Sequence, residues 1–348
     1  MPEQKKHTSI VKREPTSISR VSKSIEITNK LLSIAEEPFL IPYRKGDKWG
    51  FCDKNKRIII PCIYEDAHRF SEGLAAVELK GKWGFIDKTG KEVVPCIYDV
   101  PWNYENKVIF SEGLVLVRYN DKYGYIDNTG KKVIPFIYDD AWIFSEGLAA
   151  VKFKDKYGFI DKTGKEVIPC RYDSLDIDYH TFSEGLAAVG YNGKGGYIDK
   201  TGKVVIPLIY DWTYNFHEGL AAIRHNHKWS FIDKTGGKVI PYRRDMSYSS
   251  FSEGLAGVQF KDKYGYIDKT GKVVIPCRYD WDYNSNPFLE GLAVVTYNRK
   301  YGFIDKTGNE IIPIIYDLAH NFSEGLAKVM FNRKDGYINK AGTEFWED

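Results

Sequence analysis

Apolar and polar residues alternate in short runs along most of the chain. Residues 144–173, which read FSEGLAAVKFKDKYGFIDKTGKEVIPCRYD, show the pattern well. Alternation with a period of two is the signature of a half-buried strand. It predicts three short strands in this segment, at Leu148–Phe153, Tyr157–Asp161 and Glu166–Ile168. Helical periodicity is absent from residues 38–348, so we expect this body to be all-β.

The turns between these strands are short and polar. Gly164 stands where the hairpin between the second and third strands needs a residue with positive φ. Other segments of the same kind keep this glycine, but the first has Lys56 there, so we expect strain or a different turn. Pro169 follows the third strand, and a proline either ends a strand or marks it as an edge, because it cannot donate to the ladder.

The whole segment is repeated along the chain. The pentapeptide FSEGL recurs with small changes at intervals of 34 to 40 residues, starting at Phe70, Phe110, Phe144, Phe182, Phe216, Phe251, Phe288 and Phe322. A fixed period in this range indicates a solenoid, a propeller or another array. One unit copied nine times rarely builds an asymmetric catalytic site, so we expect a protein that is not an enzyme.

The two ends of the array bear on whether it is open or closed. It starts near a first strand, at Phe39–Arg44, and ends just after a third strand, at Glu344–Trp346. It is therefore in phase at both ends, whereas a propeller commonly closes by mixing strands from both termini. Nine units also exceed the usual range of about four to eight blades. These points favour an open β-solenoid or superhelical array over the alternative, a β-propeller-like ring.

The N-terminal segment differs from the repeats. Residues 1–21 are basic and rich in Ser, Thr and Lys, and we expect a disordered tail there. Residues 22–37 fit an amphipathic helix that caps the first repeat or binds a partner. Residues 1–36 carry the whole net charge of +3, which leaves the repeat body neutral. A neutral body argues against nucleic-acid binding.

Each unit also repeats its charged residues. A lysine precedes an aromatic-glycine pair, an aspartate follows five residues later, and a glutamate precedes the glycine of FSEGL. These charges could form a binding ladder. A structural interpretation is favoured, in which the aspartate caps the Lys-Thr-Gly turn, the lysine stem covers the ring, and the glutamate bonds backbone amides.

The cysteines fit a packing role in a reducing compartment. Four of them share one slot after the proline, which holds Phe136 or Leu208 in other units; these four are Cys62, Cys96, Cys170 and Cys277. A slot that accepts cysteine or a large apolar residue is an apolar packing position. The fifth, Cys52, stands where other units have isoleucine. We expect neither disulfides nor a metal site, and no cofactor.

The fixed order of FSEGLAAV, K-W/Y-G-FIDKTG and VIPxxYD resembles the bacterial WG-repeat family, also called KWG repeats. The resemblance runs from about Pro38 to Asp348 and covers nine units. It implies a β-rich, non-catalytic interaction module, and it supplies no catalytic residue. Departures from the motif at Gly195, Ser230 and Asp335 suggest locally weaker packing.

Function is expected in the variable loops between Tyr-Asp and the next Phe-Ser-Glu, because insertions in solenoids often cluster on the binding face. These loops carry aromatic residues beside acidic ones, which suits recognition of a protein partner. The candidate partner-binding residues are Trp102, Tyr104, Trp142, Tyr179, Trp212, Tyr214, Trp281 and Tyr283. The alternative is a structural role, in which the tryptophans fill gaps between units.

Two other functions remain open. Rows of exposed aromatics could stack on sugars, which would make the protein a carbohydrate or cell-envelope binder. An enzyme site could be improvised from Asp173, Asp176 and Asp178, although these fit a polar loop better. The chain shows no hydrophobic signal segment and no run of 18 apolar residues, so we expect no membrane span and a cytoplasmic location. Export without a hydrophobic signal remains an alternative.

Overall fold

The computed structural model describes residues 39–99, 110–175, 181–243, 246–280 and 287–347. The chain divides into two parts, Met1–Phe39 and Leu40–Asp348, and only the second is described below. The predicted tail 1–21 and helix 22–37 lie outside the described residues. So do five of the candidate loop residues, namely Trp102, Tyr104, Tyr179, Trp281 and Tyr283.

The described body is all-β, as predicted, and consists of small antiparallel sheets in tandem. The fourth unit contains β12 (Asp140–Ala141), β13 (Leu148–Phe153), β14 (Lys156–Asp161) and β15 (Glu166–Tyr172), hydrogen-bonded in that order. The expected three strands per unit are therefore corrected to four. The additional strand β12 has only two residues, which is too short to show a period in the sequence.

The remaining strands repeat this arrangement along the chain. The first three units contain β1 (Ile41–Lys45), β2 (Lys48–Cys52) and β3 (Ile58–Tyr64); β4 (Asp66–Ser71), β5 (Leu74–Leu79), β6 (Lys82–Asp87) and β7 (Glu92–Tyr98); and β8 (Phe110–Ser111), β9 (Leu114–Tyr119), β10 (Lys122–Asp127) and β11 (Lys132–Tyr138). The fifth and sixth contain β16 (Ser174–Leu175), β17 (Leu186–Tyr191), β18 (Lys194–Asp199) and β19 (Val204–Tyr210); and β20 (Trp212–Thr213), β21 (Leu220–His225), β22 (Lys228–Asp233) and β23 (Lys238–Arg243). The last three contain β24 (Met246–Ser252), β25 (Leu255–Phe260), β26 (Lys263–Asp268) and β27 (Val273–Asp280); β28 (Leu292–Tyr297), β29 (Lys300–Asp305) and β30 (Glu310–Tyr316); and β31 (Leu318–Ala319), β32 (Leu326–Phe331), β33 (Lys334–Asn339) and finally β34 (Trp346–Glu347).

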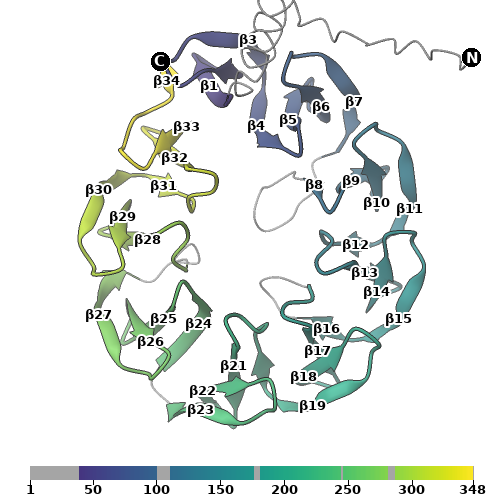
Figure 1. Cartoon of the computed structure of the whole chain (residues 1–348), viewed down its shortest axis with the longest axis vertical. Helices are drawn as coiled ribbons and strands as arrows, with labels where there is room; N and C mark the ends of the chain where they lie inside the picture. Colours follow the sequence, from purple (N-terminus) through teal and green to yellow (C-terminus); the bar gives the residue numbers. More distant parts are fainter. Residues whose placement is uncertain (1–38, 100–109, 176–180, 244–245, 281–286, 348) are drawn as a thin grey trace, which may run out of the picture. The chain divides into compact units, whose positions relative to one another are not determined.

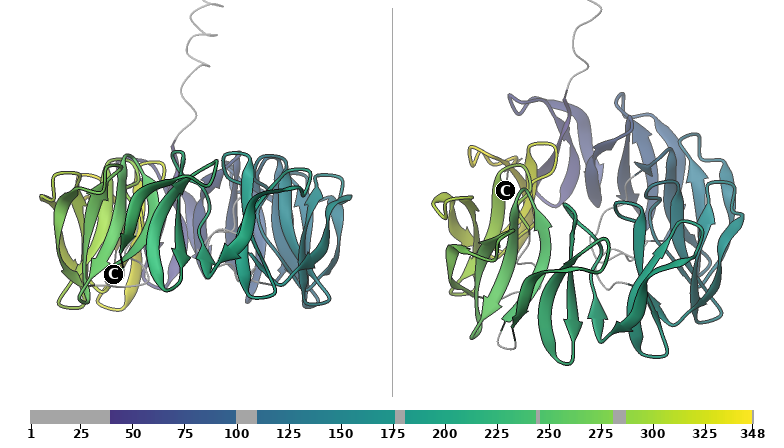
Figure 2. Two further views of the ribbon diagram at one scale, coloured as in Figure 1. Left: turned by 90° about the horizontal axis from the view of Figure 1, so that it is seen from below. Right: turned by 60° about the horizontal axis from the view of Figure 1, so that its bottom comes forward.

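The body closes into a ring, so the expectation of an open array is wrong and the propeller-like alternative holds. Successive sheets follow one another around a centre, with strands such as β15 on the outer rim and β12 on the inside (Figure 1). Seen from the side, the ring is a disc one sheet deep (Figure 2). β34 pairs in parallel with β1, through Arg44 with Trp346 and Lys45 with Glu347. The C-terminal strand thus adds the fourth strand to the sheet of the first unit, which is why in-phase ends did not exclude closure.

Aromatic rings pack each unit against the next. The ring of Phe159 in the fourth unit lies 4.8 Å from that of Phe182 in the fifth, and both are almost fully buried. Equivalent pairs, with ring centroids 4.8 to 5.2 Å apart, join Phe51 to Phe70, Phe85 to Phe110, Tyr125 to Phe144, Tyr197 to Phe216, Phe231 to Phe251, Tyr266 to Phe288 and Phe303 to Phe322. The FSEGL phenylalanine of each unit therefore packs into the core of the unit before it, and we call this contact the phenylalanine plug.

The glycine of the Lys-aromatic-Gly step is required by the outer strand. A Cβ atom on Gly158 would lie 2.5 Å from the carbonyl oxygen of Ile168. The outer strand does not end at its proline, as one interpretation had it. It continues to Tyr172 through a bulge, so the proline marks an edge strand. Ser230, which replaces this glycine in the sixth unit, is fully buried and its Oγ donates to the Ile240 carbonyl at 2.5 Å.

The Lys-Thr-Gly turn keeps its geometry in the first unit. Gly164 has φ +83° and its N–H donates to the Asp161 carbonyl. Lys56 takes the same position with φ 61°, and its N–H donates to the Asp53 carbonyl at 3.0 Å. Of the two predicted outcomes the structure shows strain, since a side chain in the left-handed region clashes with its own backbone.

Candidate functional site

On one face of the ring, six of the FSEGL glutamates join their unit to the next. A carboxylate oxygen of Glu184 accepts the backbone N–H of Gly219 at 3.0 Å and lies 2.9 Å from Lys234 Nζ, both in the following unit. Partial burial opposes ionisation, but the bonds from Lys234 and Gly219 hold the pKa of Glu184 below its usual value. The same Glu–Lys clasp recurs as Glu112 with Lys162, Glu146 with Lys200, Glu218 with Lys269, Glu253 with Lys306 and Glu290 with Lys340.

On the opposite face, the aspartate of Tyr-Asp makes a second junction. Asp139 accepts a hydrogen bond from Lys122 Nζ of its own unit at 2.6 Å and another from the backbone N–H of Lys154 in the next unit at 2.7 Å. The hydrogen bond from Lys122 is the main reason that the pKa of Asp139 is lowered. Equivalent Asp clasps centre on Asp173, Asp211, Asp280 and Asp317.

These contacts assign structural roles to the repeated charges. The predicted turn cap is confirmed, since Asp161 Oδ1 accepts the N–H groups of Thr163 and Lys165. The predicted bond from the glutamate to a backbone amide is confirmed as well. The partnership of the lysine with the Tyr-Asp aspartate was missed, although a constant spacing of 17 residues in each unit was the available signal.

Three of the candidate loop residues lie in the described part of the chain. Trp142 and Tyr214 occupy the same slot in two different units, and both are half-buried. The ring of Trp142 lies 5.8 Å from that of Tyr157 and packs into the core between the fourth and fifth units. Tyr214 lies 5.8 Å from Trp229 in the same way. These two aromatics therefore fill gaps between units.

The third described candidate is Trp212, on the inner strand β20. Its backbone pairs with Arg224 and its side chain is half-buried. His68 holds in the second unit the slot that Trp142 holds in the fourth, and its ring lies 4.9 Å from that of Trp83. Burial lowers the pKa of His68 to about 4, so its ring is neutral at neutral pH.

The thiols are free in the described residues and poorly suited to chemistry. Burial raises the pKa of Cys52 to about 12 and that of Cys96 and Cys170 to about 11. A thiol of such high pKa carries little nucleophilic thiolate at neutral pH. Within the described ranges, no group of three or more His, Cys, Asp or Glu side chains is placed to hold a metal ion.

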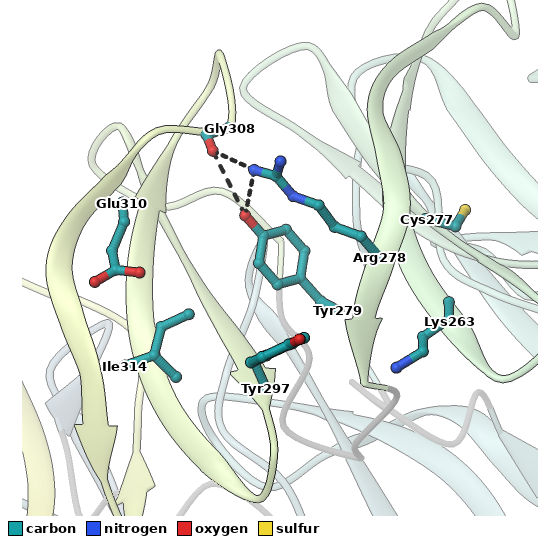
Figure 3. Close-up of a pocket in the computed structure, with 8 residues that line it drawn as sticks. All are labelled: Lys263, Cys277, Arg278, Tyr279, Tyr297, Gly308, Glu310 and Ile314. Atoms are coloured by element: carbon teal, nitrogen blue, oxygen red, sulfur yellow. Dashed lines mark hydrogen bonds between the residues drawn. The ribbon is translucent and has the colours of Figure 1, made fainter.

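A hollow of about 620 Å³ opens on the rim between the seventh and eighth units (Figure 3). Arg278 crosses it, and its Nη2 donates to the Gly308 carbonyl at 2.7 Å and to the Tyr279 hydroxyl oxygen at 2.8 Å. Arg171 makes the same two contacts with Tyr172 and Gly202 between the fourth and fifth units. Each arginine thus bonds the neighbouring unit, so the hollow lies at a junction between two units.

The fold and the junctions define a closed ring of repeated four-stranded β-sheets. Eight consecutive matches to the WG containing repeat cover residues 49–334. The chain therefore belongs to the WG-repeat family, as its motifs indicated. None of the curated proteins matches the chain. Among the described residues, no helix is both long and apolar enough to span a membrane.

Solved structures with a similar fold have very different sequences. A structure described as "Crystal structure of the eukaryotic initiation factor" has a TM-score of 0.58 and 12% identity, and the match covers 87% of this chain and 93% of that chain. Kluyveromyces lactis Hsv2p matches with a TM-score of 0.43 and 8% identity, covering 68% and 93%. Citrobacter koseri AztD matches with a TM-score of 0.43 and 11% identity, covering 89% and 94%. At 12% identity the first similarity concerns the fold alone. The TM-scores of the other two are too low to support a conclusion.

Proposed function

We propose that the protein is a non-enzymatic scaffold that binds a protein partner through the loops between Tyr-Asp and the next Phe-Ser-Glu. The observation that carries this proposal is the use of the repeated polar groups. Six of the FSEGL glutamates and five of the Tyr-Asp aspartates are engaged, with their lysines, in junctions between units. The repeated part of the sequence thus builds the ring, and recognition is left to segments that depart from the repeat.

Those segments differ in length and composition, and they hold most of the non-repeated aromatic residues. Residues 100–104 read VPWNY, and residues 281–283 read WDY. Tryptophan and tyrosine provide large contact areas with little loss of side-chain freedom, and both are enriched at binding hot spots. In the described part, Trp212 extends this set on an inner strand.

The test compares two sets of aromatic substitutions in the full chain. The loop variant carries Trp102→Ala, Trp212→Ala and Trp281→Ala, and it omits Trp142 because that ring packs in a junction. The control variant carries Tyr119→Ala, Tyr191→Ala and Tyr297→Ala, which remove aromatic rings that are 39 to 50% exposed and lie outside the variable loops.

A partner is isolated from the source organism with the wild-type protein, purified, and titrated calorimetrically with each variant. Loss of at least tenfold in affinity with the loop variant, but not with the control variant, supports the proposal. Equal affinity for all three proteins overturns the assignment to the loops. Binding of purified glycans with no protein partner overturns the scaffold proposal in favour of carbohydrate recognition.

A further inference from the structure

The ninth unit departs from the repeat at two neighbouring positions. Lys328 stands where other units have a small or apolar residue, such as Ala150, Ala188 or Ala222, and Asp335 replaces the aromatic of the Lys-aromatic-Gly step. In the fourth unit, Ala150 and Tyr157 face the fifth unit in the core between them. The corresponding side of the ninth unit faces the first unit, so both departures lie at the point where the ring closes (Figure 1).

The two departures form one charged cluster. Lys328 Nζ lies 3.1 Å from Asp335 Oδ2 in its own unit and 3.5 Å from Asp66 Oδ2 in the second unit. It also lies 5.8 Å from the ring centroid of Trp49 in the first unit. Only 23% of the Lys328 side chain and 25% of the Asp66 side chain are exposed. The ammonium group therefore sits where the ninth, first and second units meet.

Three further bonds cross the same seam. Arg44, whose exposure is 5%, donates from Nε to the Asp335 carbonyl at 2.6 Å. Arg69 in the second unit donates to the Ser323 carbonyl in the ninth at 2.9 Å. Lys45 lies 3.2 Å from Glu347. These bonds stand where interior junctions have the pair of aromatic rings and where six of them also have the Glu–Lys clasp. The first unit contains no FSEGL segment to supply the phenylalanine.

Nearly identical interior junctions create a problem of register. A surface that fits the next unit of its own chain also fits the corresponding unit of another chain, and such head-to-tail contacts generate open filaments when they do not close. A buried charge is tolerated only beside its partner, so an unmatched charge disfavours the wrong contact. The lysine and the aspartate at the seam are matched only when the ninth unit docks on the first and second units. Docking on any other unit leaves them unmatched and is disfavoured.

We propose that Lys328, Asp335, Asp66 and Arg44 form a closure lock, which matches the ninth unit to the first and second units of the same chain. The lock selects a closed ring of nine units over chains joined end to end. This inference does not rest on the loop-binding function: of the four residues only Asp66 belongs to a variable loop, and it is not among the candidate partner-binding residues. It also replaces the earlier interpretation of Asp335 as a site of weaker packing.

The test removes the charges and keeps the shapes. The seam variant carries Lys328→Met, Asp335→Asn and Asp66→Asn. Its matched control carries Lys234→Met and Glu184→Gln, which remove a Glu–Lys clasp at an interior junction. Both proteins and the wild type are unfolded, refolded at several concentrations, and measured for mass by light scattering and for size by small-angle X-ray scattering.

The seam variant is expected to refold with at least a threefold larger fraction of multimers or of open, larger monomers than the wild type, while the control matches the wild type. The same fractions for all three proteins would overturn the proposal, as would an equal increase in the control. If the seam variant fails to fold, the single change Asp66→Asn provides a second test. Exchange of the Gly46 amide, which donates to the Glu347 carbonyl, is expected to rise at least fivefold in this variant, and unchanged exchange would overturn the lock.

Discussion

The backbone of Trp346 pairs in parallel with that of Arg44, so the last strand of the chain completes the first sheet. The side chain of Trp346, in contrast, packs against the ninth unit. It covers Gly336 of the ninth unit so closely that a Cβ there would lie 2.1 Å from the indole. One residue therefore holds the two ends of the array together, by its backbone on one side and its ring on the other.

Replacing Trp346 by alanine should loosen this closure. The ring is half-buried, so we expect a loss of about 2 to 3 kcal/mol, at the lower end of the range for removing a large aromatic. The measurement is urea unfolding followed by fluorescence and circular dichroism. Phe153→Ala, which removes a ring that is 37% exposed, is the control and should cost less than about 1 kcal/mol. Equal losses would show that Trp346 has no special role.

The close approach of the outer strand predicts a strong effect at Gly158. A methyl group there meets the Ile168 carbonyl at 2.5 Å, and backbone cannot move aside cheaply, so Gly158→Ala should cost about 2 to 3 kcal/mol. Gly147 has φ +87° but open space around its Cβ position, so Gly147→Ala should cost only about 1 kcal/mol. Urea unfolding separates the two, and an equal cost would contradict the steric explanation.

The strained turn of the first unit predicts a stabilising substitution. Lys56 has φ 61°, a conformation that costs a non-glycine residue roughly 1 to 2 kcal/mol. Lys56→Gly should therefore stabilise the protein by about 0.5 to 1 kcal/mol after the added freedom of the unfolded chain is subtracted. The reciprocal change Gly164→Lys should destabilise it. Thermal melting tests both, and changes of the same sign would refute the argument.

The buried histidine predicts a loss of stability in mild acid. The folded pKa of His68 is about 4, whereas its ordinary value is 6.5, and burial is the main cause. Between these values the unfolded chain binds a proton that the folded protein does not. Stability should therefore fall as the pH drops from about 6.5 to about 4. The change His68→Phe should flatten this part of the curve of Tm against pH, and an unchanged slope would argue against the role of His68.

The carboxylates of the Asp clasps affect stability at a lower pH than His68 does. The pKa of Asp211 is lowered to about 2, chiefly by the hydrogen bond from Lys194. Its contribution is fully present above the ordinary pKa of 3.8 and is lost as the pH falls toward about 2. Asp211→Asn should leave a smaller decline in Tm between about pH 4 and 2 than in the wild type. A decline of the same size would show that Asp211 does not contribute to the loss of stability in acid.

The repeat sequence predicted much of the local structure because its signals are local. The alternation at residues 148–153 gave the bounds of β13 as they are observed, and Gly164 marked its turn. Closure could not be predicted in this way. It depends on Trp346 meeting Arg44 across the whole array, and two paired residues leave no periodic signal. The inner strand β12 was missed for the same reason.

The candidate site was less predictable than the fold. A tryptophan in a variable loop can face solvent or fill a gap, and its sequence context does not distinguish the two. Trp142 fills a gap because its slot faces Tyr157 and the next unit. The seam cluster shows the converse. Lys328 and Asp335 look like isolated departures along the sequence, and only the ring brings them to Asp66.

Ring closure is tested most directly by a disulfide across the seam. Lys45 and Glu347 are strand partners, and their side chains already form an ion pair at 3.2 Å. In a variant with Lys45→Cys and Glu347→Cys, mild oxidation should link the two ends within one chain. The product would be a monomer with altered electrophoretic mobility that is restored by reduction. Free thiols at both positions, or links only between different chains, would contradict the closed ring.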